Sequence, residues 1–347
     1  MDILKIIFIY IGLIIGAGFA SGREICEYFN FCSNTDYTGI AVASLLFIFI
    51  CYAVLKKSMK YKLYNISDYV KHTFSFSKIF QYFFLFLIFA DLTAGLIVML
   101  SSWGEIMNSI FDIPKLAGSL LLALLCFGVF IFDIKGIAAI NIILVPVIVI
   151  TITVICLFSI LTKISSPAFN SLNMFMGFNR NMLLMSICYV SYNTLTAASV
   201  LSPLAKSISS RKTILIGSVT AGAVIGLLIY LVWMAVGLNF NTLWYESFPM
   251  KKLAGMINDN LEQIYSLCLL FSIFTTAVAE GYGLLSYFKI NTVLKRATLS
   301  IILFAILMPF SMINFAYLVK NLYFIMGFLG MFWMVTILID YLKDLNK

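Results

Sequence analysis

The stretch IIGAGFASGREI, residues 14–25, interrupts an otherwise apolar N-terminal segment. Glycine, alanine and serine dominate positions 16–22, and an Arg-Glu pair follows them directly. Glycine adopts backbone conformations that other residues avoid, and it lets another group approach the chain closely. The stretch therefore predicts a break in the first helix that frees backbone N–H and C=O groups in the middle of an apolar span.

The composition around this stretch is that of an integral membrane protein. Of the 347 residues, 62% are hydrophobic and only 11% are charged, whereas about a quarter of the residues of a soluble domain are charged. No polar run is long enough for a soluble domain, so we expect a single membrane domain over residues 1–347. The net charge of +8 is explained by Lys and Arg in loops between spans, and it does not indicate a nucleic-acid partner.

The sequence also argues against an enzyme. His72 is the single histidine, so neither a histidine-based transition-metal site nor a Ser-His catalytic pair is expected inside the membrane. No nucleophile-base set is recognisable, and we expect no cofactor other than a coupling ion. The cysteines lie mostly in apolar spans, where packing is their expected role, although Cys26 and Cys32 flank the first loop and could pair.

Apolar runs of about 20 residues are long enough to cross a bilayer as helices. We therefore expect an all-α polytopic protein with ten transmembrane helices. The expected spans lie near residues 3–29, 37–55, 79–107, 115–132, 136–162, 181–204, 213–238, 261–287, 297–313 and 315–341.

Ten spans place both termini on one side of the membrane. Most of the 23 Lys and Arg residues fall in loops on the side of the termini, so the positive-inside rule assigns both termini to the cytoplasm of a multi-pass plasma-membrane protein. The loop 56–78 on that side contains a segment that suits a short helix on the inner membrane surface.

A second interruption is expected in the sixth span. The segment YVSYNTLTAASVLSP, residues 189–203, places hydroxyls, an asparagine and a proline inside an apolar helix. The first and sixth spans correspond in a 5+5 inverted repeat, which we expect over residues 1–162 and 179–342. Paired interruptions of this kind indicate the binding site of a secondary transporter. Alternatively, the glycines of the first span serve only close helix packing.

Charged side chains inside spans add candidates for function. Asp91 lies near the centre of the third span, where an intramembrane carboxylate suggests a partner for a cationic solute or a proton carrier. Arg23 and Glu24 follow the first break, where a charged pair suits an aqueous vestibule, although a structural ion pair is the alternative. Glu280 lies either at the site or close to the solvated end of its span. Arg23, Glu24 and Glu280 are the candidates for gating or proton linkage.

Three hydroxyls share one face of the eighth span. Ser272, Thr275 and Thr276 follow the spacing i, i+3, i+4. Such hydroxyls either bond to carbonyls of their own helix or contribute to a site for a hard cation such as Na⁺. Carbonyls freed beside the break in the first span would then supply the remaining oxygen ligands.

These segments resemble a known family. The runs GAGFASGREI, SYNT with VLSP after it, and FTTAV are similar to the YkvI-type membrane proteins of the amino acid-polyamine-organocation superfamily, which has the LeuT fold. The resemblance covers essentially the whole chain. It implies a LeuT-like 5+5 inverted repeat in which interrupted helices 1 and 6 hold the solute, helped by helices 3 and 8.

The same resemblance implies an ion site. In sodium-coupled members, first-helix carbonyls before the Gly-x-Gly break and eighth-helix hydroxyls hold the ion. The matching positions are Gly12, Ile15, Ser272, Thr275 and Thr276. Some proton-coupled relatives replace the ion with a fifth-helix lysine, and this chain has no lysine in the middle of its fifth span.

We therefore expect a cation-coupled secondary transporter of a small polar or zwitterionic solute, such as an amino acid or related amine, with Na⁺ or H⁺ as the coupling ion. The alternative is a receptor with a transporter fold that senses a ligand without accumulating it.

Phe19 follows the Gly-x-Gly of the first span, at a position where many amino acid carriers have a small or polar residue. The candidate solute-binding residues are Gly16, Ala17, Gly18, Phe19, Ala20, Ser21, Gly22, Asp91, Tyr189, Tyr192, Asn193 and Thr194.

Overall fold

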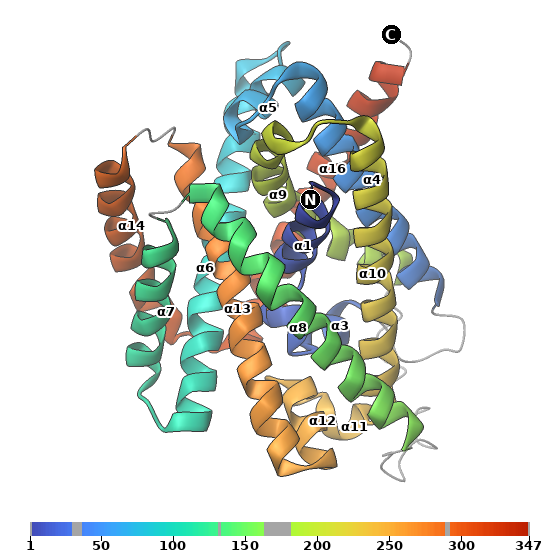
Figure 1. Cartoon of the computed structure of the whole chain (residues 1–347), viewed down its shortest axis with the longest axis vertical. Coiled ribbons are helices and arrows are strands. Elements are labelled where there is room, and N and C mark those ends of the chain that lie inside the picture. The colour runs from blue at the N-terminus through green and yellow to red at the C-terminus, as the bar shows by residue number, and fades with distance from the viewer. Residues whose placement is uncertain (1, 30–36, 131–132, 163–181, 289–291, 346–347) are drawn as a thin grey trace.

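The computed structural model of the chain describes residues 2–29, 37–130, 133–162, 182–288 and 292–345, and within these ranges every regular element is a helix (Figure 1). Cys32, the considered partner of Cys26, lies outside the described residues, as do residues 163–181, which include the start of the expected second repeat. The long apolar helices are α4 (Tyr37–Tyr61), α6 (Lys78–Phe111), α8 (Asp133–Leu161), α9 (Met182–Leu204), α10 (Arg211–Gly237), α13 (Asp259–Tyr287), α14 (Val293–Leu307) and α16 (Phe324–Leu345).

The number of spans agrees with the sequence-based expectation. Eight helical stretches in the described part of the chain are long and apolar enough to cross a membrane. A shorter apolar helix, α7 (Lys115–Phe130), and the broken first span bring the number to ten. The last span begins with α15 (Phe315–Leu318) and a π-helical segment, η4 (Val319–Tyr323), before α16.

The helix expected between the second and third spans is present as α5 (Ile66–Thr73). The side chain of Asn65 caps it by accepting a hydrogen bond from the Ser67 backbone N–H at 2.8 Å, which satisfies one of the free donors at a helix start. Lys57 of α4 donates to the Thr73 hydroxyl and pairs with Asp340 of α16. The helix α5 lies at the end of the bundle that carries the C-terminus, and α11 (Phe240–Leu243) and α12 (Pro249–Ile257) lie at the opposite end (Figure 1).

The first span is broken as the glycine-rich stretch predicts. It consists of α1 (Asp2–Ile14), a four-residue helix α2 (Ala17–Ala20) and α3 (Arg23–Tyr28). Gly16 is extended between the first two pieces, and Gly22, with φ of 80°, joins the second to the third in the left-handed region. Only glycine adopts that region without strain, so the sequence specifies the second joint directly.

The interruption expected in the sixth span is not observed, because α9 is one continuous helix from Met182 to Leu204. Its polar side chains bond to carbonyls of their own helix. Asn193 Nδ2 donates to the Tyr189 carbonyl at 2.9 Å, and the Thr194 hydroxyl donates to the Val190 carbonyl at 2.7 Å. The polar groups are thereby satisfied without unwinding. Pro203 lies next to the last residue of the helix, where it breaks no central turn.

The interior of the bundle is formed by the helices that carry the candidate residues. In their most apolar 18-residue windows, α9 is 83% buried and α13 is 78% buried, whereas α14 is 17% buried. The helix α13 packs against α6 and α8, and α1 packs against α8, α10 and α13. Most side chains in the apolar parts of α9 and α13 therefore face other helices rather than lipid, which is where intramembrane polar groups are expected to function.

Replacing Gly22 with alanine is expected to destabilise the protein. A Cβ at this position would be forced into a left-handed conformation and would lie 2.9 Å from Met250 Cγ, and the backbone term alone costs about 1–2 kcal/mol. The melting temperature in detergent should fall. The control is Gly128→Ala, because a Cβ on Gly128 would meet no described atom within 4 Å. An equal melting temperature for the two variants would contradict the left-handed joint.

Candidate functional site

The break in the first span exposes carbonyl groups that side chains of other helices recognise. Gly12 and Ile15 lie just before and within the break, and their carbonyls accept hydrogen bonds from α13. Thr276 Oγ1 donates to the Gly12 carbonyl at 3.0 Å, and Ser272 Oγ donates to the Ile15 carbonyl at 2.5 Å. We call this set of two carbonyls and two hydroxyls the α1–α13 junction. It brings together four of the five residues proposed from sequence to hold a cation.

Thr275 makes a different contact from its two neighbours. Its hydroxyl donates to the Ser272 carbonyl of its own helix at 3.0 Å, which is the alternative recognised for a hydroxyl in a helix. The structure therefore does not place Thr275 at the junction. Gly16 does border it, because a Cβ on Gly16 would lie 3.1 Å from Thr276 Oγ1.

Asn141 of α8 is a neighbour of the junction that the sequence reading missed. It is fully buried, and neither its oxygen nor its nitrogen has a hydrogen-bond partner among the described residues. A Cβ on Gly12 would lie 3.1 Å from Asn141 Cγ. A buried amide without partners is costly, so Asn141 offers a further oxygen ligand beside the carbonyl-bearing residue Gly12. The residues present therefore suit a hard cation, whose ligands are oxygens.

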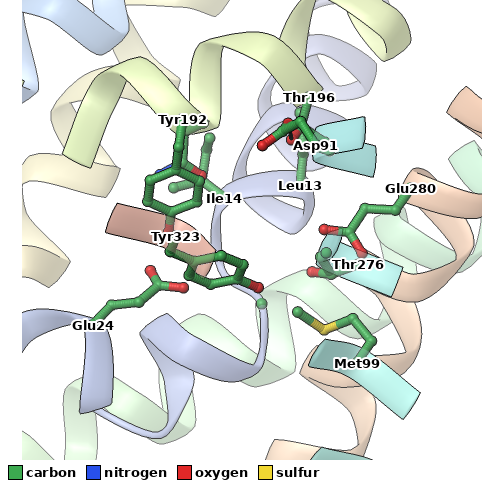
Figure 2. Close-up of a pocket in the computed structure, with 13 residues that line it drawn as sticks. Leu13, Ile14, Glu24, Asp91, Met99, Tyr192, Thr196, Thr276, Glu280 and Tyr323 are labelled. Atoms are coloured by element: carbon green, nitrogen blue, oxygen red, sulfur yellow. Dashed lines mark hydrogen bonds between the residues drawn. The ribbon is translucent and has the colours of Figure 1, made fainter. Parts of the chain in front are cut away.

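A pocket lies beside the junction, where the break in the first span faces α6, α9, α13 and η4 (Figure 2). The empty space among its lining atoms is about 340 Å³, and part of this space is open to solvent. Its lining combines carboxylates, tyrosines, small residues and a thioether. The lining residues are Leu13, Ile14, Gly16, Glu24, Asp91, Gly95, Met99, Tyr192, Asn193, Thr196, Thr276, Glu280 and Tyr323.

Asp91 faces this pocket from α6, as its central position in the third span suggests. It is 4% exposed, and its Oδ2 accepts a hydrogen bond from the Thr196 hydroxyl of α9 at 2.8 Å. A single neutral donor does not compensate a buried carboxylate fully. The pocket therefore presents Asp91 as an acceptor with remaining capacity.

Two further carboxylates, Glu24 and Glu280, reach the pocket through gaps left by glycines. A Cβ built on Gly18 would overlap the Glu24 carboxyl group, and one built on Gly95 would overlap that of Glu280. Glu24 Oε2 and Glu280 Oε2 are buried and have no hydrogen-bond partner in the described part of the chain. Glu280 is 5% exposed, so it belongs to the pocket and not to a solvated end of its helix.

Arg23 does not share the environment of Glu24. Its guanidinium is paired with Glu27 of α3 at 2.5 Å and donates to the Trp244 carbonyl at 2.5 Å. The guanidinium carbon of Arg23 also lies 5.5 Å from the centroid of the Trp244 ring, in a cation–π contact. The expectation that Arg23 and Glu24 form a pair lining one vestibule is therefore wrong, because successive helical residues point in directions about 100° apart.

Several other candidates from the first break pack in the core. Phe19 is fully buried and is not among the residues that line the pocket. The Ala20 carbonyl accepts a hydrogen bond from Tyr265 at 2.5 Å, and the Ser21 carbonyl accepts one from the Met250 backbone N–H at 2.8 Å. These contacts satisfy carbonyls freed by the second joint, so they hold the break in place. Ala17 and Gly22 likewise do not line the pocket.

The sixth-span candidates divide between the pocket and the core. Tyr192 and Asn193 line the pocket, whereas Thr194 bonds within α9. Tyr189 packs with its ring 5.4 Å from Tyr28 and 5.8 Å from Phe47, and it is not a lining residue.

The sequence reading missed Gly95, Met99 and Tyr323, and it did not single out Thr196. Thr196 and Gly95 carried weak signals, since the first lies in the polar run of the sixth span and the second lies one helical turn after Asp91. No sequence pattern indicated Tyr323, because the π-helical segment η4 places its ring. This ring stacks on that of Tyr192, with the two centroids 4.7 Å apart.

The helix arrangement of this chain is similar to that of several solved membrane transporters. The sodium-coupled sialic acid symporter has a similar structure, with a TM-score of 0.68 over 95% of this chain and 76% of that one at 11% identity. The manganese transporter of Eremococcus coleocola gives 0.63 over 98% and 86% at 12% identity. MhsT in complex with L-phenylalanine gives 0.62 over 94% and 87% at 15% identity. The fold is the LeuT fold of membrane transporters.

Two proteins of Bacillus subtilis are similar to this chain in sequence. No family model matches the chain. It is 26% identical to the uncharacterized protein YyaD of Bacillus subtilis over 97% of this chain and 96% of that one. It is also 26% identical to the uncharacterized membrane protein YkvI of the same organism over 81% and 79%. The chain is thus similar to YkvI-type membrane proteins, as its motifs suggest.

Proposed function

We propose that the protein is a cation-coupled secondary transporter of a small solute, with Na⁺ as the coupling ion. The observation that carries this proposal is the α1–α13 junction, where carbonyls released by the break meet hydroxyls directly beside a buried pocket. Broken helices place ion ligands and solute ligands together in this way in secondary transporters. The Gly12 and Ile15 carbonyls, with Ser272 and Thr276, are the proposed ligands, and Asn141 is an additional candidate.

The solute is proposed to bind in the adjoining pocket, against Asp91, Tyr192 and Asn193. Thr276 lines the pocket and also belongs to the junction. An ion held at the junction would therefore orient a wall of the solute site. This shared residue gives a physical route for coupling, because each ligand would favour the same arrangement of α1 and α13.

Contacts at the α11–α12 end suggest which part of the structure moves. The Met250 backbone N–H binds the Ser21 carbonyl, and Arg23 binds the Trp244 carbonyl. Both contacts tie the segment between α10 and α13 to the outer pieces of the first span. We propose that this segment covers the pocket in the state described here and withdraws during alternating access, as covering segments do in other proteins with gated sites.

The test is uptake into proteoliposomes that contain the purified protein. An inward Na⁺ gradient should drive accumulation of a labelled amine or amino acid above its external concentration, and replacing Na⁺ with K⁺ should reduce uptake about tenfold or more. Accumulation driven by a proton gradient without Na⁺ would overturn the choice of ion. Saturable binding without accumulation under either gradient would overturn transport and support the receptor alternative.

A further inference from the structure

The charge of the pocket limits what it can bind. Asp91, Glu24 and Glu280 reach it from α6, α3 and α13, and none of the described lining residues is Lys, Arg or His. Buried carboxylates are costly to hold together unless protonation or a bound cation neutralises their charge. A bound cation would remove that cost.

The two glutamates are built into the pocket and are not incidental neighbours of it. Each occupies the space that a side chain would fill on a glycine of another segment, Gly18 for Glu24 and Gly95 for Glu280. Each keeps one buried oxygen without a partner among the described residues. Because Glu24 folds back over Gly18, the protein supplies its own carboxylate at the break in the first span. The break is where a substrate carboxylate would otherwise interact with freed backbone N–H groups.

The carboxylates lie on two sides of the pocket. Asp91 and Gly95 are one turn apart on the same face of α6, and Glu280 lies over Gly95, so Asp91 and Glu280 share one side. Glu24 lies across from them, and the ring of Tyr323, on which Tyr192 stacks, lies between the two sides (Figure 2). Aromatic faces attract cations and pack against aliphatic chains.

We propose that the solute is an organic cation with an amino group at each end of a short aliphatic chain and no carboxylate. One ammonium group would bind Glu24, the other would bind Asp91 and Glu280, and the methylene groups would pack against the two tyrosine rings. The inference rests on the proposed function for the location of the site, and it replaces the zwitterionic amino acid with a diamine. A zwitterion would bring a carboxylate into a pocket that already holds three.

A bare divalent metal ion fits the described residues less well. No group of three or more His, Cys, Asp or Glu side chains within the described ranges could hold a metal ion. The carboxylates are separated by tyrosine rings instead of converging on one point (Figure 2). An extended cation satisfies this separation, whereas a single ion does not.

The experiment measures binding to the full-length protein in detergent by isothermal titration calorimetry. The buffer contains NaCl at about 0.15 M, which is physiological ionic strength. The probes are 1,4-diaminobutane, butylamine, L-alanine and MnCl₂. The diamine is expected to bind most tightly, butylamine about 10- to 100-fold more weakly because it lacks one charged hydrogen-bonding group, and L-alanine more weakly still. Tighter binding of L-alanine or of Mn²⁺ than of the diamine would overturn the inference, as would no binding of either amine.

Variants test the assignment of the two sides. Glu24→Gln and Glu280→Gln should each weaken binding of 1,4-diaminobutane about 10- to 100-fold, and Glu24→Gln should reduce the advantage of the diamine over butylamine. The matched control is Asp259→Asn, which removes an exposed carboxylate from the start of α13. Unchanged diamine affinity in both glutamate variants, with melting temperatures like that of the parent, would overturn the inference.

The proposed ligand class and the proposed transport activity can be contradicted by different results. Diamine binding without accumulation in proteoliposomes contradicts the proposed transporter and leaves the ligand class intact. Sodium-driven accumulation of L-alanine, with no competition by 1,4-diaminobutane, contradicts the ligand class and leaves the transporter intact.

Discussion

Thr276→Ala is expected to abolish the stimulation of solute uptake by Na⁺ while the protein remains folded. The Thr276 hydroxyl meets the Gly12 carbonyl at 3.0 Å and is 3% exposed. Alanine removes this oxygen and leaves the carbonyl without its α13 partner. A hydrogen bond to a charged group contributes about 1.5–3 kcal/mol. Loss of an oxygen ligand of similar strength should lower the apparent affinity for Na⁺ about 10- to 100-fold, so that Na⁺ no longer stimulates uptake at concentrations that stimulate the parent.

The measurement is initial uptake into proteoliposomes as a function of Na⁺ concentration. Ser266→Ala is the matched control, because Ser266 is a buried hydroxyl on the same helix that bonds to the Glu262 carbonyl of α13. It should keep the Na⁺ dependence of the parent. Equal Na⁺ dependence for Thr276→Ala and the parent, at equal amounts of folded protein, would refute the junction as the ion site.

Gly18→Ala is expected to cause the second large loss, through the position of Glu24. The added Cβ would overlap the Glu24 carboxyl group, and that group is the end of a flexible side chain, so it can move without unfolding the protein. We expect the melting temperature to stay close to that of the parent. Binding of 1,4-diaminobutane should weaken about tenfold, because the displaced carboxylate would lose its charge-assisted bond to the solute.

A double-mutant cycle separates this mechanism from a general disturbance of the break. If Gly18→Ala acts by displacing Glu24, the change should have little further effect in a Glu24→Gln background, since coupled residues give non-additive effects. Gly128→Ala in α7, where a Cβ meets open space, serves as the neutral control. Fully additive losses in the cycle would show that Gly18 acts independently of Glu24.

The sequence predicted a feature correctly where residues of the same segment determine that feature. The glycines at positions 16–22 produce the break in the first span, since the left-handed φ of Gly22 is a local backbone property. The spacing of Ser272 and Thr276 places them on one helical face, and apolar length predicts the spans. The same local reasoning was wrong for α9, where the polar side chains bond to their own helix and leave it continuous.

By itself, then, the sequence determined an all-helical membrane protein with a broken first span, a hydroxyl face on the eighth and a buried acid, Asp91, on the third. The tertiary structure alone decided that Glu24 and Glu280 face the same pocket as Asp91, that Arg23 turns away to Glu27, and that Tyr323 forms part of the wall. Each of these placements depends on a gap or partner supplied by a distant segment, such as the space above Gly95 for Glu280. Side-chain spacing within one helix cannot specify a cavity that several helices enclose together.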